Sequence, residues 1–173
     1  SDMEKRKRDI KRKLDESNKK SEEAVREVER KLDESNKEVK KKEERVEDEL
    51  RKLEEKRRRG SGEELLRRVK ELEDDLRRKL KEVRDRHDRL RRELEKILEK
   101  LKEDHKRIVD ELKKGPDDEK LKDIERELRE NLKRNEDIVR EILKKLEDNL
   151  RRVEKLAEDI RRKLEKVADD LRK

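Results

Sequence analysis

The sequence predicts an all-α protein, an elongated antiparallel up-down-up three-helix bundle with nearly straight helices, which spans residues 1–173 as a single domain. Two observations predict it. Glycine and proline occur only at two short breaks, which leave three long uninterrupted segments. Within each segment, apolar residues recur at helical spacing among charged residues, and 65% of the chain is charged while 25% is apolar. Because an average soluble domain is about 25% charged, an ordinary mixed globular domain is excluded.

The two breaks set the boundaries of the helices. The first is Gly60-Ser61-Gly62 and the second is Gly115-Pro116. In both, basic residues precede the glycine and acidic residues follow it, which suits the negative end of one helix dipole and the positive end of the next. The sequence therefore predicts helices over about 2–59, 62–114 and 117–172. Such short connections make neighbouring helices antiparallel.

Capping residues support the three helix starts. Ser61 and Glu64 have the spacing of a capping box, in which each side chain satisfies a free backbone N–H group of the other. Ser1 and Glu4 have the same spacing. Asp117 is suited to cap the third helix.

The sequence repeats every 18 residues and not every seven. The octapeptide Arg-Lys-Leu-Asp-Glu-Ser-Asn-Lys occurs at 12–19 and again at 30–37. Five core positions fall in each repeat, which gives the 3.6 residues per turn of a straight α-helix. A heptad frame started at Ile10 reaches Lys31 and Glu38 and so fails. Since a 3.5-residue period would impose a left-handed supercoil, we expect a nearly untwisted bundle.

One register aligns polar residues of all three segments. It pairs the first and third segments at an offset of 114, and the first and second where residue numbers add up to about 122. Two mixed triplets then fall level with one another: Ser17, His105 and Asn131, and Ser35, His87 and Asn149. A hydroxyl, an imidazole and a carboxamide can satisfy one another's hydrogen bonds, so we expect two buried polar layers. A smaller pair, Ser21 with Asn135, is expected to face Leu101.

The two histidines raise the question of metal binding or catalysis. His87 and His105 are too far apart in one chain to share an ion, and no metal-binding spacing occurs. A serine beside a histidine resembles a nucleophile–base pair, but regular helices provide no evident oxyanion hole. The chain also has no cysteine. We therefore expect no catalytic residue, no metal ligand and no cofactor, and a structural role for the six polar-layer residues.

The charge pattern argues against nucleic-acid and membrane partners. The net charge is +7, but the 53 acidic residues are interspersed with the 60 basic ones, and no aromatic side chain is present to stack on bases. No apolar run is long enough for a membrane span or a signal peptide. We expect no partner, a monomer, and a soluble protein that is cytoplasmic on recombinant expression. Self-association through exposed Leu66, Leu132 or Leu150 stays open.

The repeated octapeptide, the leucine-rich stripes and the Gly-Ser-Gly and Gly-Pro-Asp-Asp loops resemble de novo designed helical bundles. More narrowly, the chain resembles parametrically generated, single-chain three-helix bundles with an 18-residue repeat. The resemblance implies a structural scaffold without a natural activity, substrate, cofactor, cellular location or partner. Strong helix formers, short loops and caps predict that the bundle is hyperstable. Two alternatives remain. One is a natural spectrin-like or coiled-coil spacer, which would normally show aromatic residues and heptads. The other is a histidine-based pH switch or metal-binding bundle.

Overall fold

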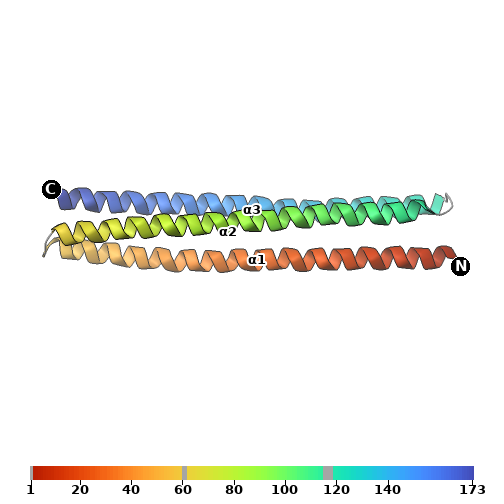
Figure 1. The fold of residues 1–173 in the computed structure, drawn as a ribbon, viewed down its shortest axis with the longest axis horizontal. Helices are drawn as coiled ribbons and strands as arrows, with labels where there is room; N and C mark the ends of the chain where they lie inside the picture. Colours follow the sequence, from red (N-terminus) through yellow and green to blue (C-terminus); the bar gives the residue numbers. More distant parts are fainter. Residues whose placement is uncertain (1, 60–61, 115–118) are drawn as a thin grey trace. The chain divides into compact units, whose positions relative to one another are not determined.

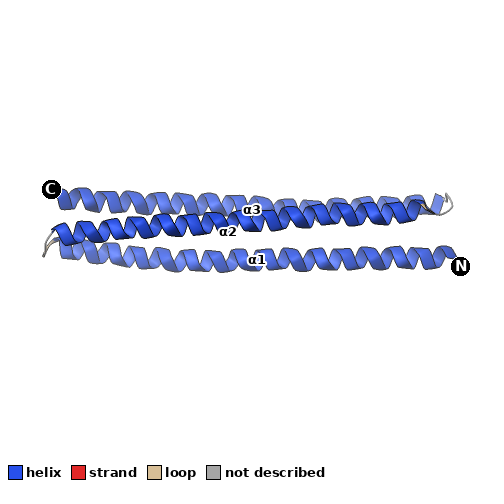
Figure 2. Cartoon of the chain, in the orientation of Figure 1, coloured by secondary structure: helices blue, strands red, loops and turns tan. Residues whose placement is uncertain are grey.

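The protein is built from three long α-helices. The structure, a computed structural model, describes residues 2–59, 62–114 and 119–173. It contains α1 (Asp2–Arg57), α2 (Gly62–Lys113) and α3 (Glu119–Arg172), labelled in Figure 1. Over these described residues there is no strand (Figure 2). The predicted all-α class is confirmed.

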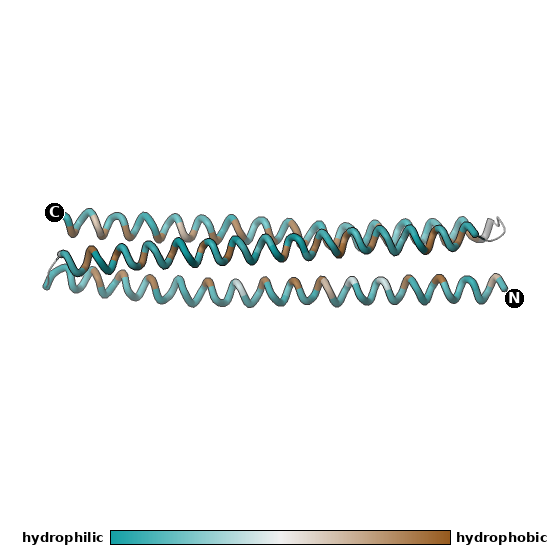
Figure 3. The backbone as a smooth tube through the Cα atoms, viewed as in Figure 1, coloured by the Kyte–Doolittle hydropathy of each residue, from teal (hydrophilic) through white to brown (hydrophobic). Residues whose placement is uncertain are grey.

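Local sequence explains why these helices form. Leucine, lysine, arginine and glutamate dominate all three, and these are strong helix formers. Apolar residues recur along each helix between hydrophilic ones (Figure 3). On the polar faces, ion pairs join successive turns, as where Arg161 contacts Glu158 at 2.6 Å and Glu165 at 2.5 Å. Each such pair stabilises a helix by only about 0.2–0.5 kcal/mol, so burial of the apolar face must supply most of the stability.

The helix ends lie close to the predicted ends. Arg58 N donates to Glu55 O at 3.3 Å and Arg59 N donates to Lys56 O at 2.9 Å. These bonds span three residues, so the chain tightens into a turn and α1 ends at Arg57 rather than at residue 59. Lys114 makes the same type of bond after α2. The predicted caps Ser1, Ser61 and Asp117 lie outside the described residues.

The chain divides into two compact units, each built from parts of all three helices. Unit 1 comprises Ser1–Arg30 and Leu90–Lys145, and unit 2 comprises Lys31–Arg89 and Leu146–Lys173. Each unit has its own aliphatic core. In unit 1 the core includes Ile10, Ile108, Leu112, Leu121 and Leu128. In unit 2 it includes Val46, Leu50, Leu53, Leu65, Val69, Leu72, Ile160, Leu164, Val167 and Ala168.

Interhelix ion pairs fix the direction of the helices within each unit. In unit 1, Lys13 of α1 contacts Glu111 of α2 at 2.5 Å, whereas Ser17, one turn later, contacts the earlier residue Asp104 at 2.9 Å. The two helices are therefore antiparallel and lie close to the predicted pairing. In unit 2, Arg57 contacts Asp170 at 3.0 Å, and Glu47 contacts Lys163 at 3.9 Å. Since both numbers rise together, α1 and α3 are parallel there.

The buried face is wider than the predicted stripe. Ala168 is buried although it lies beside the line of core positions that runs through Leu164 and Val167. Leu66, Leu132 and Leu150, which were expected to be exposed, are half-buried. A helix packed against two neighbours buries a broader face than one packed against a single partner, so residues flanking the stripe also lose contact with water. Among the described residues, Ile138 is the large apolar residue that is exposed, with 48% of its surface accessible to solvent.

Candidate functional site: the buried polar layers

Three polar side chains lie in the core of unit 2. Ser35 of α1 is 1% exposed, His87 of α2 is 2% exposed and Asn149 of α3 is 6% exposed. They are buried because they stand on the core face of each helix, at positions of the repeat that aliphatic residues otherwise occupy. Burying a polar group without a partner costs about 1–3 kcal/mol, so their hydrogen bonds decide whether the layer is tolerated.

Both nitrogens of the His87 ring are engaged. Nδ1 lies 2.9 Å from Val83 O, one turn earlier in α2, and Nε2 lies 2.9 Å from Oδ1 of Asn149. Val83 O can only accept, so Nδ1 carries a proton. An imidazolium then also donates from Nε2 to the amide oxygen. A neutral ring accepts at Nε2 instead, which requires the Asn149 carboxamide to turn over and present its NH₂ group.

Within the described residues, no hydrogen bond joins Ser35 to His87 or Asn149; it is bonded instead to Arg86, which precedes His87 in α2. Arg86 Nη1 donates to Ser35 Oγ at 3.4 Å and to Glu38 Oε2 at 2.7 Å. The Arg86 hydrogen bond, against the opposing effect of desolvation, holds the pKa of Glu38 below its ordinary value. The guanidinium charge beside the layer is therefore balanced by a carboxylate. Among the described residues, no fully buried side-chain nitrogen or oxygen lacks a hydrogen-bond partner.

The second triplet, in unit 1, is arranged differently from the expectation. Ser17 Oγ donates to Asp104 Oδ2 at 2.9 Å, and Asn131 Oδ1 accepts from Asn135 Nδ2 at 3.1 Å. His105 is half-buried, and no hydrogen bond in the described part of the chain joins it to Ser17 or Asn131. Asp104 precedes His105 on the same helix. Its ionised carboxylate is a stronger acceptor than a neutral imidazole, so the hydroxyl turns to it.

Asn135 also forms a contact that the sequence did not indicate. Its Nδ2 donates to Asn18 Oδ1 at 2.7 Å, which links α3 to α1 in unit 1. The expectation paired Asn135 with Ser21 instead. Asn18 follows Ser17 directly and recurs with it in the 18-residue repeat, so the repeated Ser-Asn dipeptide is the signal that could have identified it.

The environment of His105 disfavours its charged form. Burial is the largest cause that lowers the pKa of His105, and the positive charge of Arg129 lowers it further. Glu136 and Glu125 oppose this effect. Because burial removes water from an imidazolium, the neutral ring is favoured in the folded protein.

Among the described residues, no hydrogen bond pairs a histidine of the layers with a serine. Both ring nitrogens of His87 are occupied by Val83 and Asn149, so neither is free to take a proton from Ser35. Ser17 Oγ donates to the Asp104 carboxylate and not to an imidazole. Over the residues that the structure describes, no group of three or more His, Asp or Glu side chains is placed to hold a metal ion.

A solved structure described as a "Computationally designed three helix bundle" is similar to this chain. The match has a TM-score of 0.59 and 18% sequence identity, and it covers 98% of this chain and 90% of the other. At this identity the likeness shows the fold, a three-helix bundle. No protein-family model and no curated protein sequence matches the chain. Within the described ranges, no helix carries an apolar stretch long enough to cross a bilayer.

Proposed function

We propose that this chain is a designed structural scaffold with no biochemical activity of its own. The observation that carries the proposal is the octapeptide repeated at 12–19 and 30–37, within a chain that has no aromatic residue and no cysteine. Exact repetition of surface and core residues together is typical of a sequence generated from an ideal helix geometry. The fold shared with a designed three-helix bundle supports this origin.

In this proposal the polar layers serve to fix how the helices pair. Slipping one helix by a turn would place the His87 ring against aliphatic side chains and leave Asn149 without its partner. Such mispairing costs about 1–3 kcal/mol for each unsatisfied group, whereas the native pairing adds little net stability. The 18-residue repeat also predicts helices that do not wrap around one another, which belongs to the same proposal. A crystal structure in which the helices supercoil with the usual pitch of about 150 Å would contradict it.

Thermal unfolding followed by circular dichroism tests the scaffold role. A chain designed for stability, with strong helix formers and short connections, should keep its helical signal above about 90 °C. The signal at 222 nm is recorded with and without excess Zn²⁺. A melting temperature below about 70 °C contradicts the proposal, and a large rise in melting temperature with Zn²⁺ favours a metal-binding bundle instead.

A further inference from the structure

The first half of α1 has a long interruption in its buried face. Ile10 and Val25 are 4% and 7% exposed, but no residue between them is buried. The core positions inside this gap hold Leu14, Ser17 and Ser21, which are all half-buried. The apolar face that packs α1 against its neighbours is therefore weak over about four turns of helix.

Polar contacts join this segment to the other helices of unit 1. Lys13 contacts Glu111 at 2.5 Å, and the two side chains are 41% and 45% exposed. The Ser17 hydroxyl bonds to α2, and the Asn18 carboxamide bonds to α3. Water replaces such partners when a helix leaves its neighbours, so these contacts oppose separation only weakly.

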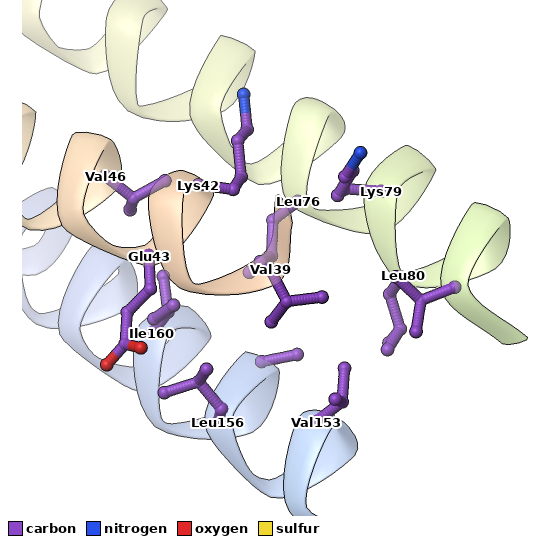
Figure 4. A pocket seen from close by; sticks show the side chains of 12 residues that line it. Val39, Lys42, Glu43, Val46, Leu76, Lys79, Leu80, Val153, Leu156 and Ile160 are labelled. Carbon is purple, nitrogen blue, oxygen red and sulfur yellow. The ribbon is translucent and has the colours of Figure 1, made fainter. Parts of the chain in front are cut away.

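The second half of α1 is held by apolar packing. Its core residues in unit 2 include Val46, Leu50 and Leu53, which are 4%, 6% and 4% exposed. Val39 and Val46 lie among aliphatic side chains of α2 and α3 (Figure 4). The same helix is thus anchored firmly in unit 2 and loosely in unit 1.

The helices α2 and α3 have apolar contacts of their own in unit 1. Leu94 of α2 and Leu128 of α3 are 0% and 1% exposed. Leu98 and Val109 are half-buried on the flank of α2 away from Asp104, which contacts α1. That flank lies towards α3, so these side chains pack α2 against α3 whether or not α1 is in place.

We propose that residues 2–24 of α1 open from unit 1 as one cooperative segment while unit 2 stays folded. Among the described residues of this segment, Ile10 is the one buried side chain. The opening ends at Val25 and Val28, which are 7% and 1% exposed and keep the rest of α1 in place. It uncovers the apolar core that Ile10 shares with Ile108.

Hydrogen exchange of the full chain, at guanidinium concentrations below the unfolding transition, tests this proposal. The amides of residues 6–24 should share one free energy of opening and one denaturant slope, both smaller than those of α2 and α3. Fraying of the helix end would instead give free energies that rise gradually from residue 6, which overturns the proposal.

The other end of the chain is the internal control for exchange at a terminus. Ile160, Leu164 and Val167 of α3 are 4%, 0% and 6% exposed. The amides of residues 160–168 should therefore stay protected under conditions in which residues 6–24 exchange. Equal protection of the two ends contradicts the proposal.

Two matched truncations separate this opening from unfolding of the whole chain. Leu53→Ala, in the core of unit 2, should speed exchange of the protected amides of unit 2 by about 30-fold or more and leave residues 6–24 unchanged. Leu14→Ala, inside the segment, should speed residues 6–24. Val46→Ala gives the same comparison as Leu53→Ala with a smaller truncation, should that variant not fold. Equal acceleration of residues 6–24 and of unit 2 in Leu53→Ala or Val46→Ala would show that α1 leaves only when the whole chain unfolds.

Discussion

Asn149 is the partner on which the buried ring of His87 depends, at 2.9 Å from its Nε2. The His87 side chain is only 2% exposed, so replacing Asn149 by alanine leaves its Nε2 buried without a partner. Asn149→Ala should therefore lower the free energy of unfolding by about 1–3 kcal/mol. The double variant His87→Leu/Asn149→Leu removes both polar groups and should be close to neutral or more stable. Guanidinium unfolding measures both. Asn36→Ala, a half-buried asparagine one position from Ser35, is the control and should change the free energy little.

His105 should make stability depend on pH in a defined window. Its pKa is lowered in the folded protein, mainly by burial, whereas the unfolded chain binds the proton at about pH 6.5. Below that pH the unfolded state holds more protons than the folded state. The free energy of unfolding is therefore highest above about pH 6.5 and falls as the pH drops towards the folded pKa.

Unfolding in guanidinium at pH 7.5 and pH 5.0, for the unaltered protein and for His105→Leu, measures this effect. The loss of stability on acidification should be smaller in the variant. The pKa of Glu111 is also lowered, chiefly by the Lys13 hydrogen bond, but both proteins carry this group, so its contribution to the acid loss cancels in the comparison. An equal loss in both proteins would show that His105 contributes nothing to the pH dependence.

At the scale of a helix, the end of α2 is held by a side chain of α1. Arg6 Nη2 donates to Glu111 O at 2.6 Å and to Leu112 O at 3.1 Å. The last carbonyl groups of a helix have no partner within it, so this guanidinium satisfies two of them and opposes the negative end of the helix dipole. Part of the contact between α1 and α2 in unit 1 is therefore a hydrogen bond from an α1 side chain to backbone carbonyl groups of α2.

Arg6→Ala should therefore loosen the last turn of α2. We expect faster amide hydrogen exchange over residues 110–114 and a free energy of unfolding lower by about 1 kcal/mol. Arg8→Ala, at an exposed position of the same helix, removes the same charge without these carbonyl contacts and serves as the control. Equal exchange rates in the two variants would mean that net charge, and not the cap, protects this turn.

The helices and their pairing were predictable from the sequence, because both depend on periodicity and on two breaks. The partners within the polar layers were less so. Ser17 and Ser35 occupy the same position of the repeat, yet Ser17 donates to Asp104 whereas Ser35 accepts from Arg86. The choice depends on which side chain of the neighbouring helix comes within reach, and spacing alone does not encode it.

At the scale of the whole chain, association of two copies would need an exposed apolar surface. A stable interface buries about 1,200–2,000 Å² and has an apolar centre. Across the described residues, Ile138 is the exposed large apolar side chain, and its neighbours in sequence are mostly charged. Copies of the chain also repel one another through a net charge of +7. We therefore expect a monomer.

Size-exclusion chromatography with light scattering measures the molar mass, which should be 21.4 kDa and independent of concentration. Two causes could keep the protein monomeric, charge repulsion between copies or the shortage of exposed apolar side chains, and only the first depends on salt. At 1 M salt the screening length falls to about 3 Å, so repulsion between copies is nearly removed. If the shortage of exposed apolar side chains prevents association, the unaltered protein and Ile138→Lys both stay monomeric at 1 M salt. A dimer that forms in high salt for the unaltered protein but not for Ile138→Lys would contradict this prediction and identify Ile138 as the point of contact.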